Sequence, residues 1–190
     1  MFLVTELILL LTSNLILTQA LGTSTLFIAA GNRKNLFWTS VTITIFTTAG
    51  SAAAYFINDI IPLGAENLMP LFYAMAVGTL YIVLLTILYF VSRKNFKTAR
   101  KYVHLSAFNC AVMGTLFTIT EKVAENHQLN TMSGFILAGL EAGLGFILAS
   151  LILTSAYRRL TSADVPASFR GFPAMLLYLG IISMAVYALS

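Results

Sequence analysis

Hydrophobic residues run in six long segments along the chain, and short polar connections separate them. The segments cover roughly residues 2–31, 37–61, 69–92, 102–120, 131–157 and 172–189. A helix needs about 20 apolar residues to cross the roughly 30 Å hydrocarbon core of a bilayer. Prolines fall in or near the connections, where they end helices at little cost. The pattern predicts an all-α integral membrane protein with six transmembrane helices.

The composition points to the same class. Hydrophobic residues make up 58% of the 190 positions and charged residues only 9%, whereas soluble domains carry roughly 25% charged residues. We expect one membrane domain over 1–190. The single cysteine excludes an internal disulfide and a self-contained four-thiolate metal site. Met1–Ala20 carries Glu6 and no basic residue, so the first segment is expected to be a retained span rather than a signal peptide.

Basic residues are concentrated in alternate connections, and this predicts the orientation. The first, third and fifth connections hold Arg33 and Lys34, then Arg93, Lys94, Lys97, Arg100 and Lys101, then Arg158, Arg159 and Arg170. Only Lys122 falls elsewhere, in the fourth connection. Because positive residues favour cytoplasmic loops, these three connections are expected in the cytoplasm and both termini outside.

Six spans divide into two sets of three, about 1–92 and 102–190, which would run oppositely through the membrane. Inverted repeats of this kind place functional sites near the midplane, often on broken helices. The first segment is about thirty residues long and contains the stretch LGTSTLF at 21–27. Two readings stay open for it: a helix interrupted at this stretch, or one long tilted helix.

The only cysteine, Cys110, lies in the stretch AFNCAVMG. It is eight residues into the fourth segment, or roughly 12 Å deep, and Ser24 lies at a similar depth in the first segment. Two amides in apolar surroundings, Asn14 and Asn109, each need a hydrogen-bond partner. A lone cysteine is often a small packing residue, or it supplies part of a site that a partner completes.

Glu141 is an ionisable residue about ten positions into the fifth segment, hence roughly 15 Å deep. It shares one helix face with Gly134, Ala138 and Gly145. Small residues mark close helix contacts in membranes, so the carboxyl is expected to face protein rather than lipid. Two roles stay open: a proton or sodium relay, or a protonated carboxyl that donates one hydrogen bond between helices.

The connection RRLTSADVPASFRG at 158–171 combines opposite charges with a proline. This composition predicts an ordered loop rather than a loose tether. The loop is either a surface that docks a partner or merely an orientation signal. Its candidate docking residues are Arg159, Asp164, Pro166 and Arg170.

Two of these stretches, NCAVMG at 109–114 and RLTSADVPASFRG at 159–171, closely resemble the RnfA/NqrE/RsxA family of six-span membrane subunits. The resemblance implies a multi-pass subunit of an Rnf-type or Nqr-type ion-translocating electron-transport complex in a prokaryotic cytoplasmic (inner) membrane. It implies an RnfE/NqrD-like sister subunit as an inverted partner, together with flavin-bearing and ferredoxin-like subunits and the lipid bilayer. Nucleic acid is not expected as a partner.

The resemblance also implies a [2Fe-2S] cluster shared with the sister subunit, through which electrons cross the membrane. Cys110 corresponds to the family's second-half cysteine. The family's first-half motif reads Leu-Gly-x-Cys, whereas LGTS places Ser24 at that position. The chain is therefore a divergent member that lacks the first-half cysteine. The hydroxyl of Ser24 does not replace the missing thiol, because a hydroxyl is a poor iron ligand. Residues expected to line the site are Asn14, Gly22, Asn109 and Gly114.

No flavin or haem of its own is expected for this subunit, and no enzymatic activity when it is alone. The alternative reading is a redox-inactive ion-pathway subunit that uses Glu141 to carry a proton or sodium, or a purely structural subunit. Two departures from the family pattern favour this alternative: the missing cysteine, and Glu141 at a position where the family usually has a small residue.

Overall fold

The computed structural model describes residues 11–12, 14–61, 66–91, 93, 96–125 and 130–188. All regular structure within these residues is helical, which confirms the expected all-α class. The elements are α2 (Leu15–Gln19), α3 (Thr23–Ala30), α4 (Arg33–Ile60), the short 3-10 helix η1 (Glu66–Leu68), α5 (Met69–Val91), α6 (Phe96–Ala107), α7 (Cys110–Glu125), α8 (Met132–Leu160) and α9 (Phe172–Tyr187).

Three single helices are long and apolar enough to cross a membrane, namely α4, α5 and α8. The pair α6 and α7, bent by 43°, makes a fourth if it is counted as one span. The 16-residue α9 is a shorter apolar helix. Residues 2–10 and 13 of the predicted first span lie outside the described residues. The described part therefore contains three or four candidate spans, and the count of six stays a prediction.

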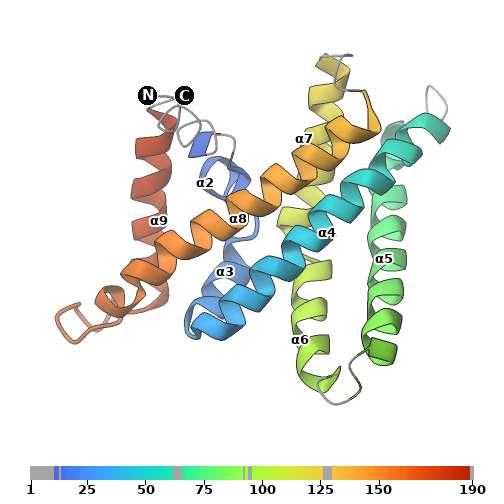
Figure 1. Ribbon diagram of the computed structural model, residues 1–190. Coiled ribbons are helices and arrows are strands. Elements are labelled where there is room, and N and C mark those ends of the chain that lie inside the picture. The colour runs from blue at the N-terminus through green and yellow to red at the C-terminus, as the bar shows by residue number, and fades with distance from the viewer. Residues whose placement is uncertain are drawn as a thin grey trace.

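The two longest helices, α4 and α8, lie side by side and antiparallel through the centre of the molecule (Figure 1). Glycines in α8 allow this close approach. A Cβ added at Gly143 would lie 2.8 Å from the Cα of Thr44, and one at Gly139 would lie 2.6 Å from the carbonyl oxygen of Thr47. Small residues at the contact let two backbones approach closely, as is common between membrane helices.

Helix α4 is rich in hydroxyl side chains, and most of them bond to their own helix. Thr42, Thr44, Thr48 and Ser51 each donate to the carbonyl oxygen four residues earlier, over 2.6–2.9 Å. These bonds satisfy the hydroxyls without water or a distant partner. A helix of mixed polarity can therefore lie at the centre of the bundle.

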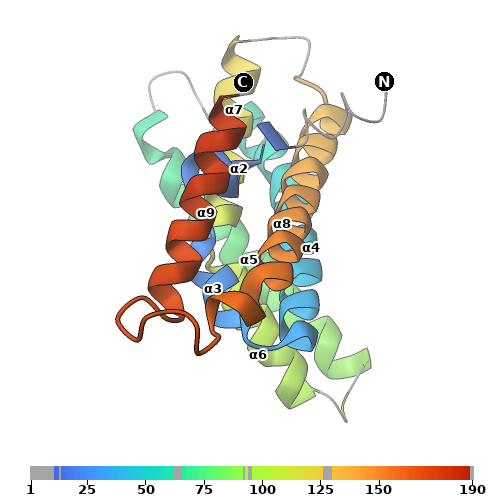
Figure 2. The ribbon, with the colours of Figure 1, turned by 90° about the vertical axis from the view of Figure 1, so that its left-hand side faces the viewer.

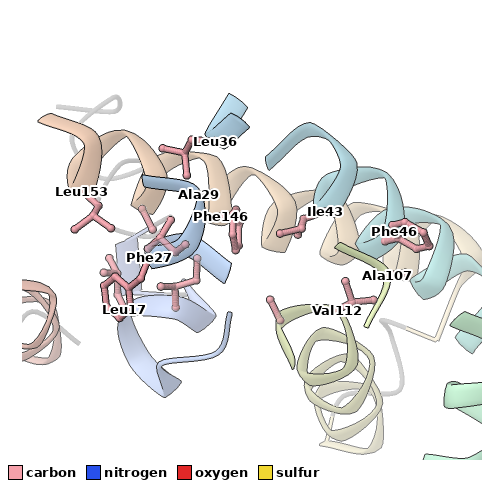
Figure 3. Packing of buried hydrophobic residues seen from close by; sticks show 14 of the residues in the cluster. Leu17, Phe27, Ala29, Leu36, Ile43, Phe46, Ala107, Val112, Phe146 and Leu153 are labelled. Atoms are coloured by element: carbon pink, nitrogen blue, oxygen red, sulfur yellow. The ribbon is translucent and has the colours of Figure 1, made fainter. Parts of the chain in front are cut away.

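The remaining helices pack around this central pair. Helices α5 and α6 lie on one side, α9 lies on the other, and α2, α3 and α7 lie between them (Figure 1). Figure 3 shows the core where they meet: Ile43 of α4 and Phe146 of α8 face Leu17 of α2 and Val112 of α7. All four side chains are buried. The short helices of both halves are thus held against the same central pair.

The predicted basic connections lie at one end of the molecule, since the start of α4, the start of α6 and the loop between α8 and α9 share that end (Figures 1 and 2). Several predicted boundaries were wrong, however, because charged residues extend the helices beyond their apolar segments. Arg33 and Lys34 open α4, Lys97 to Lys101 lie in α6, Lys122 lies in α7, and Arg158 and Arg159 lie in the last turn of α8. Long basic side chains reach the membrane surface from helix ends, so hydropathy alone places these ends too early.

Candidate functional site at two helix breaks

The first break separates α2 from α3. Ala20 and Gly22 both adopt left-handed backbone conformations, with φ of 56° and 81°, and α3 begins at Thr23. A left-handed residue ends a helix, and glycine adopts it without the penalty that a Cβ brings. The break at residues 20–22 overlaps the start of the predicted stretch at 21–27. The interrupted helix is confirmed, and the single tilted helix is wrong.

The second break separates α6 from α7 at Phe108 and Asn109. The side chain of Asn109 caps α7, because its Oδ1 accepts a hydrogen bond from the backbone N–H of Ala111 at 3.0 Å. The two helices are bent by 43° at this point. The apolar pattern predicts a span over 102–120 without a break at this position. Asparagine is a preferred N-cap residue. Asn109 within an apolar run was therefore the sequence signal that could have located the start of a new helix, and with it the break.

The two breaks touch each other. The backbone N–H of Gly22 donates a hydrogen bond to the Sγ of Cys110 over 3.0 Å. A Cβ at Gly22 would lie 2.8 Å from the Cβ of Ala111, and Gly114 packs against the side chain of Leu21. The predicted site residues Gly22, Cys110 and Gly114 are therefore brought together by contacts between the halves.

Both predicted donor side chains are accessible at these breaks. Cys110 is the first residue of α7 and its side chain is exposed, not enclosed among aliphatic neighbours. Ser24 lies two residues after Gly22, in the first turn of α3, and it is exposed as well. A residue held only for packing would be buried. The thiol is instead presented on the surface of the chain.

The two predicted amides lie beneath this surface and are nearly fully buried. Asn14 caps α2 with its Oδ1, and its Nδ2 donates to the carbonyl oxygen of Gly145 in α8 at 2.8 Å. Asn109 Nδ2 has no hydrogen-bond partner within the described residues. Each asparagine thus starts a short helix next to a break, and Asn14 also ties its helix to α8.

The donors among the described residues fit one share of a metal site rather than a complete one. The described residues contain no group of three or more His, Cys, Asp or Glu side chains that could hold a metal ion. Cys110 supplies one sulfur, already oriented by the Gly22 N–H, and Ser24 supplies only a hydroxyl. Iron–sulfur clusters are held by cysteine thiolates, and hydrogen bonds to sulfur tune them. Any such cluster at Cys110 would need most of its ligands from another chain.

A family model described as "Rnf-Nqr subunit, membrane protein" matches residues 4–190. The chain belongs to this family. Among curated relatives it is 27% identical over 178 residues to the A subunit of the ion-translocating oxidoreductase complex of Pseudoalteromonas atlantica, covering 92% of this chain and 89% of the relative. The proteins of the same name from Tolumonas auensis and Vibrio campbellii are 27% and 25% identical, with the same coverage.

In this Rnf-Nqr chain the carboxyl of Glu141 lies between α7 and α8, and a position between helices was predicted. Glu141 is half-buried and lines a cavity of about 20 Å³ with Lys122, Thr115 and Thr118 of α7. A cavity of this size holds roughly one water molecule. Lys122 was expected in a connection, and its place beside the carboxyl was not predicted. A cationic side chain thus lines the same small cavity as the carboxyl.

The loop between α8 and α9 of this Rnf-Nqr chain is ordered by its own hydrogen bonds. Arg170 donates from Nη2 to the carbonyl oxygens of Ala163 and Val165 at 3.0 and 3.1 Å. The backbone N–H groups of Phe169 and Arg170 donate to the carbonyl of Pro166. Arg159, Asp164 and Pro166 are exposed. The predicted order is confirmed, and docking of a partner stays a prediction.

Proposed function

We propose that this chain is a membrane subunit of an Rnf-like ion-translocating oxidoreductase complex, and that Cys110 is its ligand to an iron–sulfur cluster shared with a sister subunit. The relatives' name supports the first part, because they are named as a subunit of such a complex. The second part is carried by one observation: the only thiol of the chain is exposed at the point where the two helix breaks meet.

The surroundings of Cys110 suit a sulfur ligand. The Gly22 N–H donates to Sγ, and Cys110 itself opens α7, so the positive end of a helix lies at the sulfur. Both features are complementary to a negatively charged thiolate. When bound, an iron–sulfur cluster supplies one-electron transfer. The role of this chain's residues is to hold one sulfur in place and to leave its outer side open to a partner.

The proposed setting is the prokaryotic cytoplasmic membrane, with six spans and both termini outside. The shared location of the basic connections at one end supports this orientation. An RnfE/NqrD-like sister subunit, arranged as an inverted partner, would supply the ligands that this chain lacks. The exposed Arg159, in the last turn of α8, and the exposed Asp164 of the ordered loop are the proposed docking residues for another subunit at the cytoplasmic face.

The test uses the assembled complex purified with this subunit in place. We expect Cys110→Ala and Cys110→Ser to remove iron and acid-labile sulfide equivalent to one cluster and its paramagnetic signal. The matched control is Thr79→Ala, because Thr79 is exposed in α5 and bonds only to its own helix. Assembly is followed on native gels. An assembled Cys110→Ala complex with unchanged iron and signal would exclude the ligand role.

The cavity beside Glu141 favours a second candidate function, an ion pathway that needs no cluster in this subunit. A carboxyl beside space for one water molecule is suited to passing a proton or holding a sodium ion. Glu141→Gln would then abolish ion movement in the reconstituted complex while assembly is retained. Glu121→Gln, an exposed change in α7, is the control. Ion flux that is equal in both variants would reject this candidate.

A further inference from the structure

A groove of about 380 Å³ lies between the first half of α4 and the second half of α8. Its walls include Phe37 and Leu151, whose side chains are 62% and 65% exposed. Both helices are candidate membrane spans, so the groove lies along the part of the bundle expected inside the membrane. We propose that it binds an anionic phospholipid, with an acyl chain in the groove and the phosphate between Lys34 and Arg158. This proposal does not depend on the cluster or on ion movement.

The hydroxyl groups in the groove are already used as donors. Ser40 donates to the Oγ of Ser150, and Ser150 donates to the carbonyl oxygen of Ile147. Thr154 and Ser155 donate to carbonyls of their own helix at 2.7 Å. A hydroxyl has only one proton to donate. The groove therefore offers no hydroxyl donor to a quinone carbonyl or a sugar, and it suits a hydrocarbon chain.

Helix register places positive charge at one end of the groove. Lys34 lies one turn before Phe37 on the same face of α4, and Arg158 lies one turn after Ser155 on the same face of α8. Lys34 and Arg158 are both exposed. Because the helices run antiparallel, the start of α4 and the end of α8 are at the same end of the bundle (Figure 1).

A contact near this end supports the pairing of the two charges. A Cβ at Gly31 would lie 3.3 Å from the phenolic oxygen of Tyr157, so the chain three residues before Lys34 is close in space to the residue before Arg158. Neither 31–41 nor 147–160 contains an Asp or Glu that would neutralise the bases. Basic pockets between helices at the cytoplasmic side of a membrane favour anionic headgroups. A zwitterionic lipid would gain less from the same site.

The test compares lipids retained by the complex in nanodiscs of phosphatidylglycerol mixed with phosphatidylcholine, read by native mass spectrometry. We expect one phosphatidylglycerol to stay bound to the wild type. In the double variant Lys34→Gln, Arg158→Gln we expect binding about thirtyfold weaker. The control is Lys97→Gln with Lys101→Gln, which removes the same charge from exposed positions of α6. Equal loss in both double variants, or equal retention of phosphatidylcholine, would overturn the proposal.

A second measurement tests the groove without altering its charges. A photoreactive phenylalanine analogue replaces Phe37, an exposed wall residue. On illumination of the complex we expect an adduct with the mass of phosphatidylglycerol on this chain. Transfer to another protein of the complex would instead show that the groove is an interface between subunits, and it would overturn the lipid proposal.

Discussion

The backbone N–H of Gly22 lies 3.0 Å from the Sγ of Cys110, and the hydrogen bond between them joins positions that are 88 residues apart. It connects the helix break of the first half with that of the second. The bond requires the first break, because a continuous helix would already use this N–H for its own ladder. The position of the Cys110 sulfur therefore depends on the backbone conformation at Gly22, and the first prediction tests this dependence.

Gly22→Ala is expected to destabilise the subunit by about 2 kcal/mol or more. Its φ is 81°, and the new Cβ would lie 2.8 Å from that of Ala111, so strain and overlap combine. Gly78→Ala is the control, because Gly78 is helical, has no positive φ, and its added Cβ meets nothing within 4 Å. The measurements are thermal unfolding in detergent and the maleimide reactivity of Cys110. Equal stability of both variants would contradict the role of the break.

Asn14→Ala is expected to cost about 1–3 kcal/mol, because it removes both a helix cap and the hydrogen bond to Gly145. Asn32→Ala is the matched variant. Asn32 caps α4 in the same way but is exposed, so its loss should cost only about 0.5–1 kcal/mol. The difference between the two unfolding free energies measures the bond between α2 and α8. If the two costs are the same, that bond contributes nothing.

Ser24→Cys is expected to increase the iron retained by the complex, since it places a thiol at the corresponding position of the first break. This prediction rests on the proposed cluster. The measurement is iron per complex during dilution into chelator, for which we expect severalfold slower loss. Ser24→Ala serves as the control and should leave iron loss near the wild-type rate. Slower loss in neither variant would indicate that position 24 does not face the cluster.

Arg170→Gln is expected to loosen the loop between α8 and α9 and to raise its cleavage by protease severalfold. The change removes the guanidinium group that donates hydrogen bonds to the carbonyl oxygens of Ala163 and Val165. Arg159→Gln removes the same charge at an exposed site in the last turn of α8, so loop cleavage should stay unchanged. Limited proteolysis of membranes with the cytoplasmic face accessible gives the rates. Equal cleavage of both variants would show that the positive charge, and not the hydrogen bonds of the Arg170 guanidinium, determines the cleavage rate of the loop.

The approximate positions of α4, α5, α8 and α9, the end at which the basic residues gather and the family resemblance could all be predicted from the sequence. Each depends on local composition or on a contiguous motif. The break within the first segment was one of two open readings, because glycine permits a left-handed turn without requiring one. The break at Asn109 was not predicted, since one polar residue does not interrupt an apolar run in a hydropathy profile.

Only the tertiary structure decided which of these features meet. It placed Gly22 at the sulfur of Cys110, Lys122 and Glu141 around one cavity, and the glycines of α8 against α4. Membrane insertion follows hydrophobicity, which each segment carries by itself. Contacts between segments depend instead on how helices far apart in the chain pack, and a mid-membrane residue acquires its partner only when that packing is complete.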